Sequence, residues 1–592
     1  MTGRNVFGFR GDAVMKVNRG VSVKLTGCAF VSSVMFGFAL TAAPLLEPVV
    51  TVDCPAPGGW TFSVRTDEVS PGVRVARVKA TAERPTPPPT FKAIVSFPQL
   101  DAEYVWNPNF GCSENLSPMP WWGSVFTVAR TQPLRTWFNA HETNRLTVAV
   151  SELRREVKIG GGIKEEDFRI YSSYTFFAEA QEPMTGYETE LRLDARAVPF
   201  STAVREAGAW QAQKAGGRPA VPPRAAYDAL YSTWYDFHKD VTAEAVEAEC
   251  AEAARLGMKV VILDDGWQCD DIERSYASCG DWRVSARRFP DMRGHVARVH
   301  GLGLKYMVWF SMPFVGEQTE AFARLKGMFL RYNGGIKAWV LDPRFPAVRD
   351  YLRDVYLRCL RDWDIDGFKL DFVDQFALEG AVDPAVAEGY RGRDCRSIEA
   401  GVEKLLAEVT TALEAVKPGL LFEFRQSYTG PVIRKYGNMM RVADCPGSQL
   451  RNRVHMANLR LLCEGSSVHS DMLRWHPDET VVNAQRFVLS AIFGTVQYSV
   501  MLRESSPEMK AMIARWIRFA DEHRQTLQHG AFRPHFPQLN YPVIEAESDR
   551  ERIVVRYDPA VPFDLGSVTK PTIVIDAETG DVRSVVPSVR SP

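Results

Sequence analysis

Three patterns along the 592-residue sequence predict an α/β protein built on a (β/α)8 barrel, the TIM-barrel fold, with a β domain on either side. Short alternating segments fill the first third, a strand–helix rhythm follows, and short strands return near the end. The predicted domains are an N-terminal antiparallel β-sandwich at 1–206, a linker at 207–224, the barrel at 225–504, and a helix with a small C-terminal antiparallel β-sheet domain at 505–592.

The N-terminal segments have the two-residue period of strands. Trp60–Arg65 and Val73–Val78 alternate apolar and polar residues between proline and glycine clusters, which is typical of a sandwich. The apolar run Cys28–Leu46 follows Met15-Lys-Val-Asn-Arg-Gly and imitates a secretory signal with an internal start. Because this run contains polar residues and continues into strand-like sequence, we interpret it as buried strands. A cytoplasmic protein is therefore expected, unless residues 15–44 act as a signal for a periplasmic or secreted one.

The composition excludes several classes of partner. Net charge is −1, and no Lys/Arg cluster with interleaved aromatics indicates nucleic acid binding. Outside the N-terminal run, no stretch approaches the roughly 20 apolar residues that a membrane span needs. The 10 cysteines include no CxxC pair, so neither a disulfide framework nor a zinc site is indicated. We expect no metal, no cofactor, no nucleic acid and no membrane partner, and a homo-oligomer is left open.

Eight candidate strands form the barrel region. They are Leu230–Asp236, Lys259–Asp264, Lys305–Phe310, Gly367–Phe372, Leu420–Arg425, Met439–Asp444, Ser467–Asp471 and Thr495–Val500. Helical patterns such as Thr242–Leu256 and Pro346–Leu360 lie between them, and Ala338–Asp342 is an additional extended piece. Eight strands over about 280 residues fit a barrel of typically ~250. A doubly wound open sheet is the weaker alternative, because no GxGxxG follows a strand.

The tail is predicted to hold one helix, Pro507–Leu527, and strands such as Arg552–Tyr557 and Thr572–Ile575. Together these segments define the small C-terminal domain.

The strand Gly367–Phe372 carries two charges in an apolar run. Since side chains alternate along a strand, Lys369 and Asp371 point one way and their apolar neighbours the other. Burying both charges is costly unless they are paired or lie at a solvent-reachable mouth. The pattern predicts either a structural ion pair or a catalytic site.

Other polar residues collect at the predicted carboxyl ends of the strands, which is the catalytic face of TIM barrels. They are Trp234, Asp236, Asp264, Asp265, Trp267, Trp309, Arg425, Arg441, Asp444, His469 and Asp471. Carboxylates and aromatic faces suit a sugar ring, and two carboxylates can act as nucleophile and acid/base on a glycosidic bond. Asp444 could instead begin a turn, Asp374 is a fallback nucleophile, and His469 and Asp471 are expected to be structural or supporting.

These residues fall in blocks that resemble a known family. Asp264-Asp-Gly-Trp267, Gly280-Asp-Trp282, Lys305–Phe310, Val340-Leu-Asp342 and Phe368-Lys-Leu-Asp371 are similar, in order and spacing, to the blocks of clan D α-galactosidases. The resemblance is greatest to the melibiase-like enzymes of glycoside hydrolase family 36. It implies a retaining glycosidase that releases terminal α-linked galactose.

Carried over residue by residue, the resemblance makes Asp371 the nucleophile and Asp444 the acid/base. It implies that Asp264 and Asp265 bind the 4- and 6-hydroxyls and Lys369 another ring hydroxyl. Arg441 would hold the sugar in the region of Asp444 and tune the carboxyl groups, and Trp309 and Trp234 would form the pocket wall. Arg425 is also expected to contact the substrate.

Two blocks depart from the family. Phe424-Arg-Gln-Ser-Tyr-Thr-Gly430 stands where members carry Cys-x-Ser-Gly-Gly-Gly-Arg, and Ala443-Asp-Cys-Pro-Gly-Ser448 replaces Ser-Asp-x-Thr-Asp-Ala. Both lie near the sugar 2-substituent and the aglycone. Beside an α-galactosidase, the sequence therefore allows an α-N-acetylgalactosaminidase, a raffinose-synthase-like transglycosylase, or a non-catalytic sugar-binding barrel.

Overall fold

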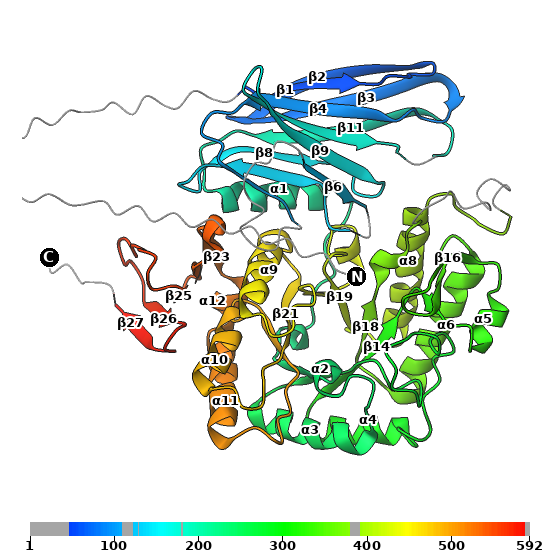
Figure 1. Ribbon diagram of the computed structural model, residues 1–592, viewed down its shortest axis with the longest axis vertical. Helices are drawn as coiled ribbons and strands as arrows, with labels where there is room; N and C mark the ends of the chain where they lie inside the picture. Colours follow the sequence, from blue (N-terminus) through cyan, green and yellow to red (C-terminus); the bar gives the residue numbers. More distant parts are fainter. Residues whose placement is uncertain (1–46, 109–121, 128–129, 179–180, 379–390, 587–592) are drawn as a thin grey trace, which may run out of the picture. The chain divides into compact units, whose positions relative to one another are not determined.

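The computed structural model describes residues 47–108, 122–127, 130–178, 181–378 and 391–586. The predicted strands within Cys28–Leu46 lie outside this part of the chain. These described residues belong to one compact unit, coloured from blue to red in Figure 1.

The N-terminal region is the predicted antiparallel sandwich. One sheet has the order β1 (Val49–Asp53), β4 (Phe91–Pro98), β10 (Arg169–Phe176), β9 (Val157–Lys164), β6 (Trp122–Phe126). The other has the order β2 (Trp60–Ser70), β3 (Val73–Thr86), β11 (Met184–Asp194), β8 (Asn144–Val150), β7 (Leu134–Phe138), β5 (Tyr104–Trp106). Alternate residues of both sheets fill the core, where the Phe97 and Trp137 rings meet edge to face at 5.1 Å.

The predicted linker differs from the structure over its first part. Helix α1 (Phe200–Lys214) continues through residues 207–214, and a 3-10 turn at Arg224–Tyr227 follows. Two of the small residues that suggested a linker, Ala207 and Gly208, lie on the buried side of this helix together with Ala203. A Cβ at Gly208 would lie 3.4 Å from the Leu462 side chain, so small residues allow close packing there.

Eight parallel strands close the barrel in sequence order, which confirms the predicted fold. They are β12 (Leu230–Ser232), β13 (Val260–Leu263), β14 (Lys305–Ser311), β18 (Gly367–Asp371), β19 (Leu421–Arg425), β20 (Met439–Arg441), β21 (Ser467–Leu473) and β22 (Thr495–Tyr498). Six of the eight strands are shorter than predicted, and β14 and β21 are longer. Trp234 and Asp236 lie in the short helix α2 (Trp234–Phe237) rather than on β12, and Asp444 lies three residues beyond β20.

Helices follow most strands and surround the barrel (Figure 1). They are α3 (Ala243–Leu256), α4 (Met292–Gly301), α6 (Pro346–Trp363), α8 (Ile398–Val416), α9 (Gln449–Leu462) and α10 (Val481–Ser490). Two residues predicted to begin helices do so. The Thr242 hydroxyl accepts the Ala245 amide hydrogen at the N-terminus of α3, and Pro346 is the first residue of α6.

The extra extended piece is part of a small sheet between β14 and β18. In this sheet β17 (Ala338–Leu341) lies between β15 (Phe314–Val315) and β16 (Phe329–Asn333), with the short helix α5 (Glu320–Arg324) between β15 and β16 in the chain.

The barrel interior changes from apolar to polar along its axis. Its lower layer is apolar, with Leu230, Val260, Ile262, Met307, Leu421 and Met439 in one buried cluster. Gly367 fits here because a Cβ would lie 2.4 Å from the Leu421 carbonyl oxygen. Two residues further along the strands, Lys369 pairs in register with Glu423, so the carboxyl end of the barrel carries buried charge.

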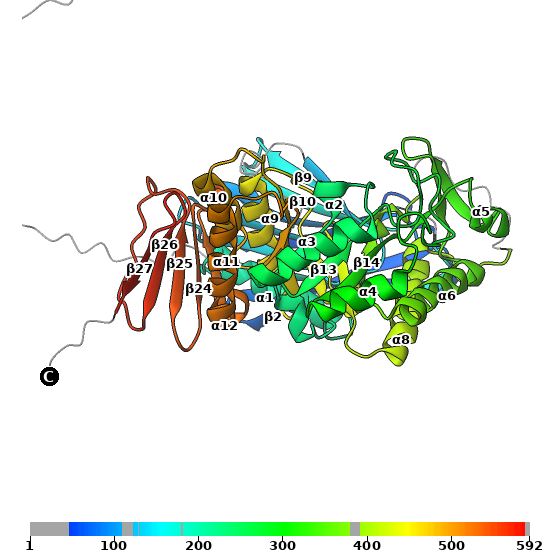
Figure 2. The same cartoon turned by 90° about the horizontal axis from the view of Figure 1, so that it is seen from below.

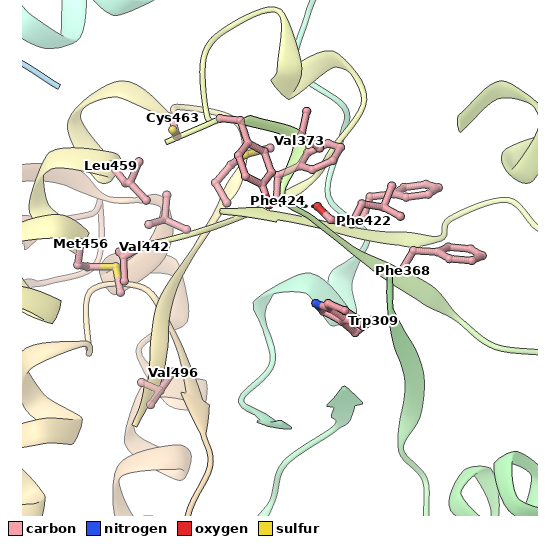
Figure 3. Packing of buried hydrophobic residues seen from close by; sticks show 14 of the residues in the cluster. Trp309, Phe368, Val373, Phe422, Phe424, Val442, Met456, Leu459, Cys463 and Val496 are labelled. Atoms are coloured by element: carbon pink, nitrogen blue, oxygen red, sulfur yellow. Dashed lines mark hydrogen bonds between the residues drawn. The ribbon is translucent and has the colours of Figure 1, made fainter. Parts of the chain in front are cut away.

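The other strand faces are apolar and pack outward. Phe368 and Phe422 project on the same side of neighbouring strands (Figure 3), and their rings stack with centroids 5.9 Å apart. Phe368 also contacts Phe310 and Tyr356, the latter from α6. The predicted alternation of β18 is therefore confirmed.

The tail forms the predicted C-terminal β domain, with two differences. The predicted single helix is broken into α11 (Pro507–Glu522) and α12 (Arg524–His529). The sheet order is β23 (Ala531–His535), β24 (Val543–Glu547), β25 (Arg552–Arg556), β26 (Thr572–Asp576), β27 (Val582–Val585), and β25 pairs parallel with β26 within an otherwise antiparallel sheet (Figure 2). Among the described helices, none combines the length and apolar character needed to cross a bilayer.

Candidate functional site

Asp371, the last residue of β18, lies in a dense set of hydrogen-bond donors. Its Oδ1 accepts from Arg425 Nε at 2.6 Å, from the Phe372 amide at 2.8 Å and from the Tyr428 hydroxyl at 3.1 Å. Its Oδ2 accepts from Trp309 Nε1 at 3.1 Å. The carboxylate is thus held mainly through Oδ1, and Oδ2 carries the remaining capacity to form a bond.

The electrostatic environment keeps Asp371 ionised. Burial raises the pKa of this carboxyl, but Arg425, Lys369 and Arg441 outweigh burial and hold the pKa well below its ordinary value. The bound donors add to the same effect because they stabilise the charged form. A carboxylate in this state is available as a nucleophile across the physiological pH range.

Lys369 forms its ion pair with Asp264, not with Asp371. Lys369 Nζ lies 2.6 Å from Asp264 Oδ2, and both side chains are buried. Asp264 Oδ1 also accepts the Asp265 amide hydrogen at 2.9 Å. The simple Lys369–Asp371 pair that β18 suggested is therefore replaced by two cross-strand pairs, Lys369 with Asp264 and Arg425 with Asp371.

The Asp264–Trp267 turn is fixed by a glycine. Gly266 has φ of +119°, and a Cβ there would lie 2.5 Å from the Lys239 carbonyl oxygen. Burial raises the pKa of Asp265 to about 6, although Gln268 donates to its Oδ1 at 2.6 Å and lowers it. The turn thus places two adjacent buried carboxyls at the barrel mouth, and their role as a sugar-binding pair stays a prediction.

Asp444 is the more exposed of the two predicted catalytic carboxyls. Its side chain is 54% exposed, and its Oδ1 lies 2.9 Å from Arg441 Nη1. Its partial burial raises the pKa, Arg441 and Arg425 lower it further than burial raises it, and the charge of Asp371 acts upward. Asp444 lies past the end of β20, as its role required, and it interacts electrostatically with Asp371.

Beneath Asp444 lies a buried network that joins Arg441, a site residue predicted from the sequence, to Asp471 and Glu423, which were not predicted to be site residues. Arg441 Nη1 donates to Asp471 Oδ1 at 2.6 Å, and Arg441 Nε lies 3.5 Å from Glu423 Oε1. Glu423 could have been found from sequence, because it shares a strand face with Arg425 two residues away. Asp471 was noticed but interpreted as structural or supporting.

The two tryptophans predicted to line the pocket, Trp309 and Trp234, differ in their distance along the chain from a barrel strand and in their burial. Trp309 is buried beside Asp371, and its ring stacks on Tyr276 at 5.9 Å. Trp234 is partly exposed at the start of α2, where the Arg274 guanidinium lies 5.5 Å from its ring. Trp267 and Trp282 are buried against each other and belong to the packing of the barrel.

The diverged segment at the end of β19 supplies hydrogen-bond donors to Asp371. Arg425 was predicted to contact substrate, and in the structure it pairs with Asp371 and lies over the Phe372 ring at 5.0 Å. The Tyr428 hydroxyl, which no strand pattern could place, bonds Asp371 from the far end of the turn. The bulky residues at this turn therefore hold the predicted nucleophile.

His469 is not part of a catalytic pair. It is fully buried, its Nε2 lies 2.8 Å from the Ala226 carbonyl oxygen, and burial lowers its pKa to about 3. Over the described residues, no group of three or more His, Cys, Asp or Glu side chains is arranged to hold a metal ion.

The fold and this site define a (β/α)8-barrel protein whose acidic and aromatic side chains converge at the carboxyl ends of the strands. A sequence model of the Melibiase family matches residues 225–530, more than half of the chain. The chain therefore belongs to the Melibiase family, which confirms the resemblance seen in the motif blocks.

Individual relatives are distant. Alpha-galactosidase 1 of Pediococcus pentosaceus is 28% identical over 200 residues, covering 32% of this chain and 26% of that protein. Alpha-galactosidase AgaA of Geobacillus stearothermophilus is 23% identical over 315 residues, covering 51% of this chain and 42% of its own. The crystal structure of an AgaA variant in complex with raffinose has a TM-score of 0.66 at 16% identity, covering 93% of this chain and 82% of that one. The chain matches less than half the length of these curated relatives, and the structural likeness shows the fold.

Proposed function

We propose that this protein hydrolyses terminal α-galactosides by a retaining, two-carboxylate mechanism, with Asp371 as nucleophile and Asp444 as acid/base. The observation that carries the proposal is the asymmetry of Asp371: three donors hold Oδ1 and one holds Oδ2. The proposal is supported by family membership and by the names of the two relatives given above, both α-galactosidases.

In the first step Asp371 Oδ2 attacks the anomeric carbon, and the bond to the leaving oxygen breaks as that oxygen takes the Asp444 proton. Oδ1 remains bound to its donors, so the attacking oxygen is oriented before substrate arrives. The product of this step is a glycosyl ester on Asp371 and a free aglycone.

In the second step the roles of Asp444 reverse. In the free protein, burial and then the negative charge of Asp371 raise the pKa of Asp444, while Arg441, Arg425 and Lys369 bring it below its ordinary value. Once Asp371 is esterified that charge is gone, the pKa of Asp444 falls, and Asp444 acts as a base toward water. Water then attacks the anomeric carbon, the ester bond breaks, and sugar leaves with its original anomeric configuration.

Substrate recognition is assigned to the acidic mouth of the barrel. Asp264 and Asp265 would accept hydrogen bonds from neighbouring sugar hydroxyls, Lys369 would donate to one, and Arg441 would bound the site on the β20 side. Trp309 and Trp234 would line the wall. This chemistry uses neither a metal nor a cofactor.

Asp371→Asn tests the assignment of the nucleophile. Turnover of an aryl α-galactoside is expected to fall by about 10³-fold or more, since a neutral amide cannot form the ester. Asp374→Asn is the matched control, because Asp374 is also a largely buried acid of the same segment; it should keep most of the activity. Full turnover by Asp371→Asn, or its loss in Asp374→Asn instead, would contradict the assignment. Asp444→Ala should be slow, and azide should rescue it and yield the α-azide.

A second function on the same site is favoured by the diverged turn. Arg425 and Tyr428 lie beside Asp371 in the segment that replaces the family's glycine-rich turn, and Tyr428 stands at a glycine position of that turn, so the 2-substituent and the acceptor would meet different groups. Turnover of α-N-acetylgalactosaminides, or transfer to an acceptor sugar in preference to water, would establish this second candidate. Exclusive hydrolysis of plain α-galactosides would remove it. Binding of α-glycosides without turnover of any of them would favour the remaining alternative, a non-catalytic sugar-binding barrel.

We propose a cytoplasmic location as well. The eight described cysteines are all free thiols, which suits a reducing compartment. N-terminal sequencing of the protein from its own cells tests this location, since cleavage near residue 44 would reveal a signal. Light scattering of the purified protein will show whether it is a homo-oligomer.

A further inference from the structure

Asp471 is a fully buried aspartate that the mechanism above does not use. It lies on β21, between His469 and Met472, where the register of pairing with β22 shifts. Such irregularities re-aim a side chain, and they are frequent next to active sites. The shift directs Asp471 toward the segment that carries Asp444.

All the hydrogen bonds to the Asp471 carboxylate come from groups at the site. Oδ1 accepts from Arg441 Nη1 at 2.6 Å. Oδ2 accepts from the Cys445 amide at 2.7 Å and from the Tyr235 hydroxyl at 3.0 Å. Since Cys445 follows Asp444 directly, Asp471 fixes the backbone next to the proposed acid/base as well as its cation.

Arg441 is shared between carboxylates. The same nitrogen, Nη1, lies 2.9 Å from Asp444 Oδ1 and 2.6 Å from Asp471 Oδ1. A guanidinium held by one carboxylate acts less strongly on a second, because the first carboxylate's negative charge offsets part of its field. The shorter contact goes to the buried Asp471, and Asp444 receives the weaker share.

We propose that Asp471 is a positioning residue for Asp444: it holds Arg441 and the Cys445 amide, and so fixes where Asp444 stands and how tightly Arg441 binds it. This inference rests on the proposed function, since it assigns Asp444 the acid/base role. A general acid must keep its proton until the leaving oxygen needs it. An Arg441 that paired with Asp444 alone would stabilise the ionised form of Asp444 and favour early loss of that proton.

The charged and titratable groups around Asp444 come from four strands and one short helix. They are Asp371 and Lys369 on β18, Arg425 on β19, Arg441 on β20, Asp471 on β21 and Tyr235 on α2. Among them Asp471 binds both Arg441 and the segment of Asp444, so its replacement changes the surroundings of the acid/base and removes no hydrogen bond to Asp371.

The test compares the kcat/KM of the Asp471→Asn variant for two substrates. α-Galactosyl fluoride loses fluoride without a general acid, whereas phenyl α-galactoside needs one. We expect kcat/KM for the phenyl substrate to fall by about 10- to 100-fold, and for the fluoride by less than about 3-fold. The alkaline limb of kcat/KM for the phenyl substrate should also move to lower pH, because a negative charge that competes for Arg441 has been removed. Equal losses on both substrates, or an unmoved alkaline limb, would overturn the proposal.

Asp342→Asn is the matched control, because Asp342 is also fully buried and bound by an arginine, Arg344 at 2.8 Å, outside the Asp444 network. It should affect stability and leave the ratio between the two substrates unchanged. If Asp471→Asn does not fold, Tyr235→Phe removes one bond to Asp471 without removing charge. It should lower the phenyl-to-fluoride ratio by about 2- to 5-fold, and an unchanged ratio would then count against the proposal.

A separate measurement keeps this inference distinct from the proposed function. If the wild-type protein cleaves neither substrate, the proposed function fails. The proton affinity of Asp444 is then read by carboxyl-carbon NMR of aspartate-labelled protein, with Asp444→Asn to assign the signal. Asp471→Asn should lower the titration midpoint of Asp444, and an unchanged midpoint would overturn the inference.

Discussion

Replacing Arg425 by Met removes the cation nearest the proposed nucleophile and keeps most of the side chain's length. Arg425 Nε lies 2.6 Å from Asp371 Oδ1, and the two side chains are only 15% and 10% exposed. Burial raises the pKa of Asp371, and Arg425 is the largest of the three cationic influences that lower it. The substitution therefore leaves burial opposed only by Lys369, Arg441 and the neutral donors.

The magnitude follows from this geometry. An adjacent arginine lowers an aspartate pKa by about 1–3 units, or about 1.4–4 kcal/mol at 1.36 kcal/mol per unit. The acidic limb of kcat/KM, which reports ionisation of the nucleophile in the free enzyme, should move up by about 1–3 pH units toward the ordinary value near 3.9. Activity at neutral pH should change much less than activity at low pH.

The assay is a pH profile of kcat/KM on an aryl α-galactoside, with urea unfolding at the same pH values. A folded-state pKa below the unfolded one gives stability that is present above about pH 3.9 and is lost as the pH falls. Arg425→Met should lose part of that stability. Arg283→Met is the matched control, since Arg283 forms an exposed pair with Glu320, and neither quantity should change. An acidic limb that stays in place in Arg425→Met would refute the reasoning.

Three further predictions concern stability. His535 is held between Glu142 and Glu545, and although burial lowers its pKa these carboxylates raise it to about 9; the resulting stability, at most about 3 kcal/mol, is present below about pH 6.5 and lost as the pH rises through 9. Urea midpoints should therefore fall over that range in wild type and much less in His535→Gln, and equal slopes would contradict this. Gly266→Ala should lower the unfolding free energy more than Gly303→Ala. Both glycines have positive φ, but of the two only a Cβ at Gly266 would have neighbouring atoms within 4 Å, those of Lys239. Equal losses in the two variants would show that the contact with Lys239 does not add to the cost. Lys369→Met should lower the unfolding free energy by about 3–5 kcal/mol, because it leaves Asp264 buried without its cation. Lys305→Met is the control: the Lys305 side chain is 50% exposed in its pair with Asp366, so its loss should cost less than about 1 kcal/mol. Similar losses of unfolding free energy in the two variants would be evidence against a buried pair.

Much of the fold could be predicted because its signals are local. The apolar runs of the barrel strands, Pro346 at a helix start and Thr242 at another all act through neighbours within a few residues. The same is true of the alternation that places Lys369 and Asp371 on one face of β18. Small residues misled the reading at Ala207 and Gly208, since the sequence does not say whether a small residue gives flexibility or close packing.

The partners of the site residues could not be predicted in the same way. Lys369 and Asp371 share a strand face, yet Lys369 binds Asp264, which directly follows β13, and Asp371 binds Arg425 from β19. Side chains two apart on one strand point the same way without meeting. Arg425 meets Asp371 from the adjacent strand β19, whereas Asp264 reaches Lys369 past β14, which lies between β13 and β18. Tyr428 reaches Asp371 from a turn whose path no periodicity describes.

The sequence by itself determined the order of the domains, the barrel and the list of acids at its mouth, because these depend on residue type and period. The tertiary structure alone decided which acid faces which cation: it closed Arg425 and Tyr428 onto one oxygen of Asp371, and it brought Asp471 under Arg441. The physical reason is that pairing of buried charges depends on distances of a few ångströms between strands, and closure of the barrel sets those distances.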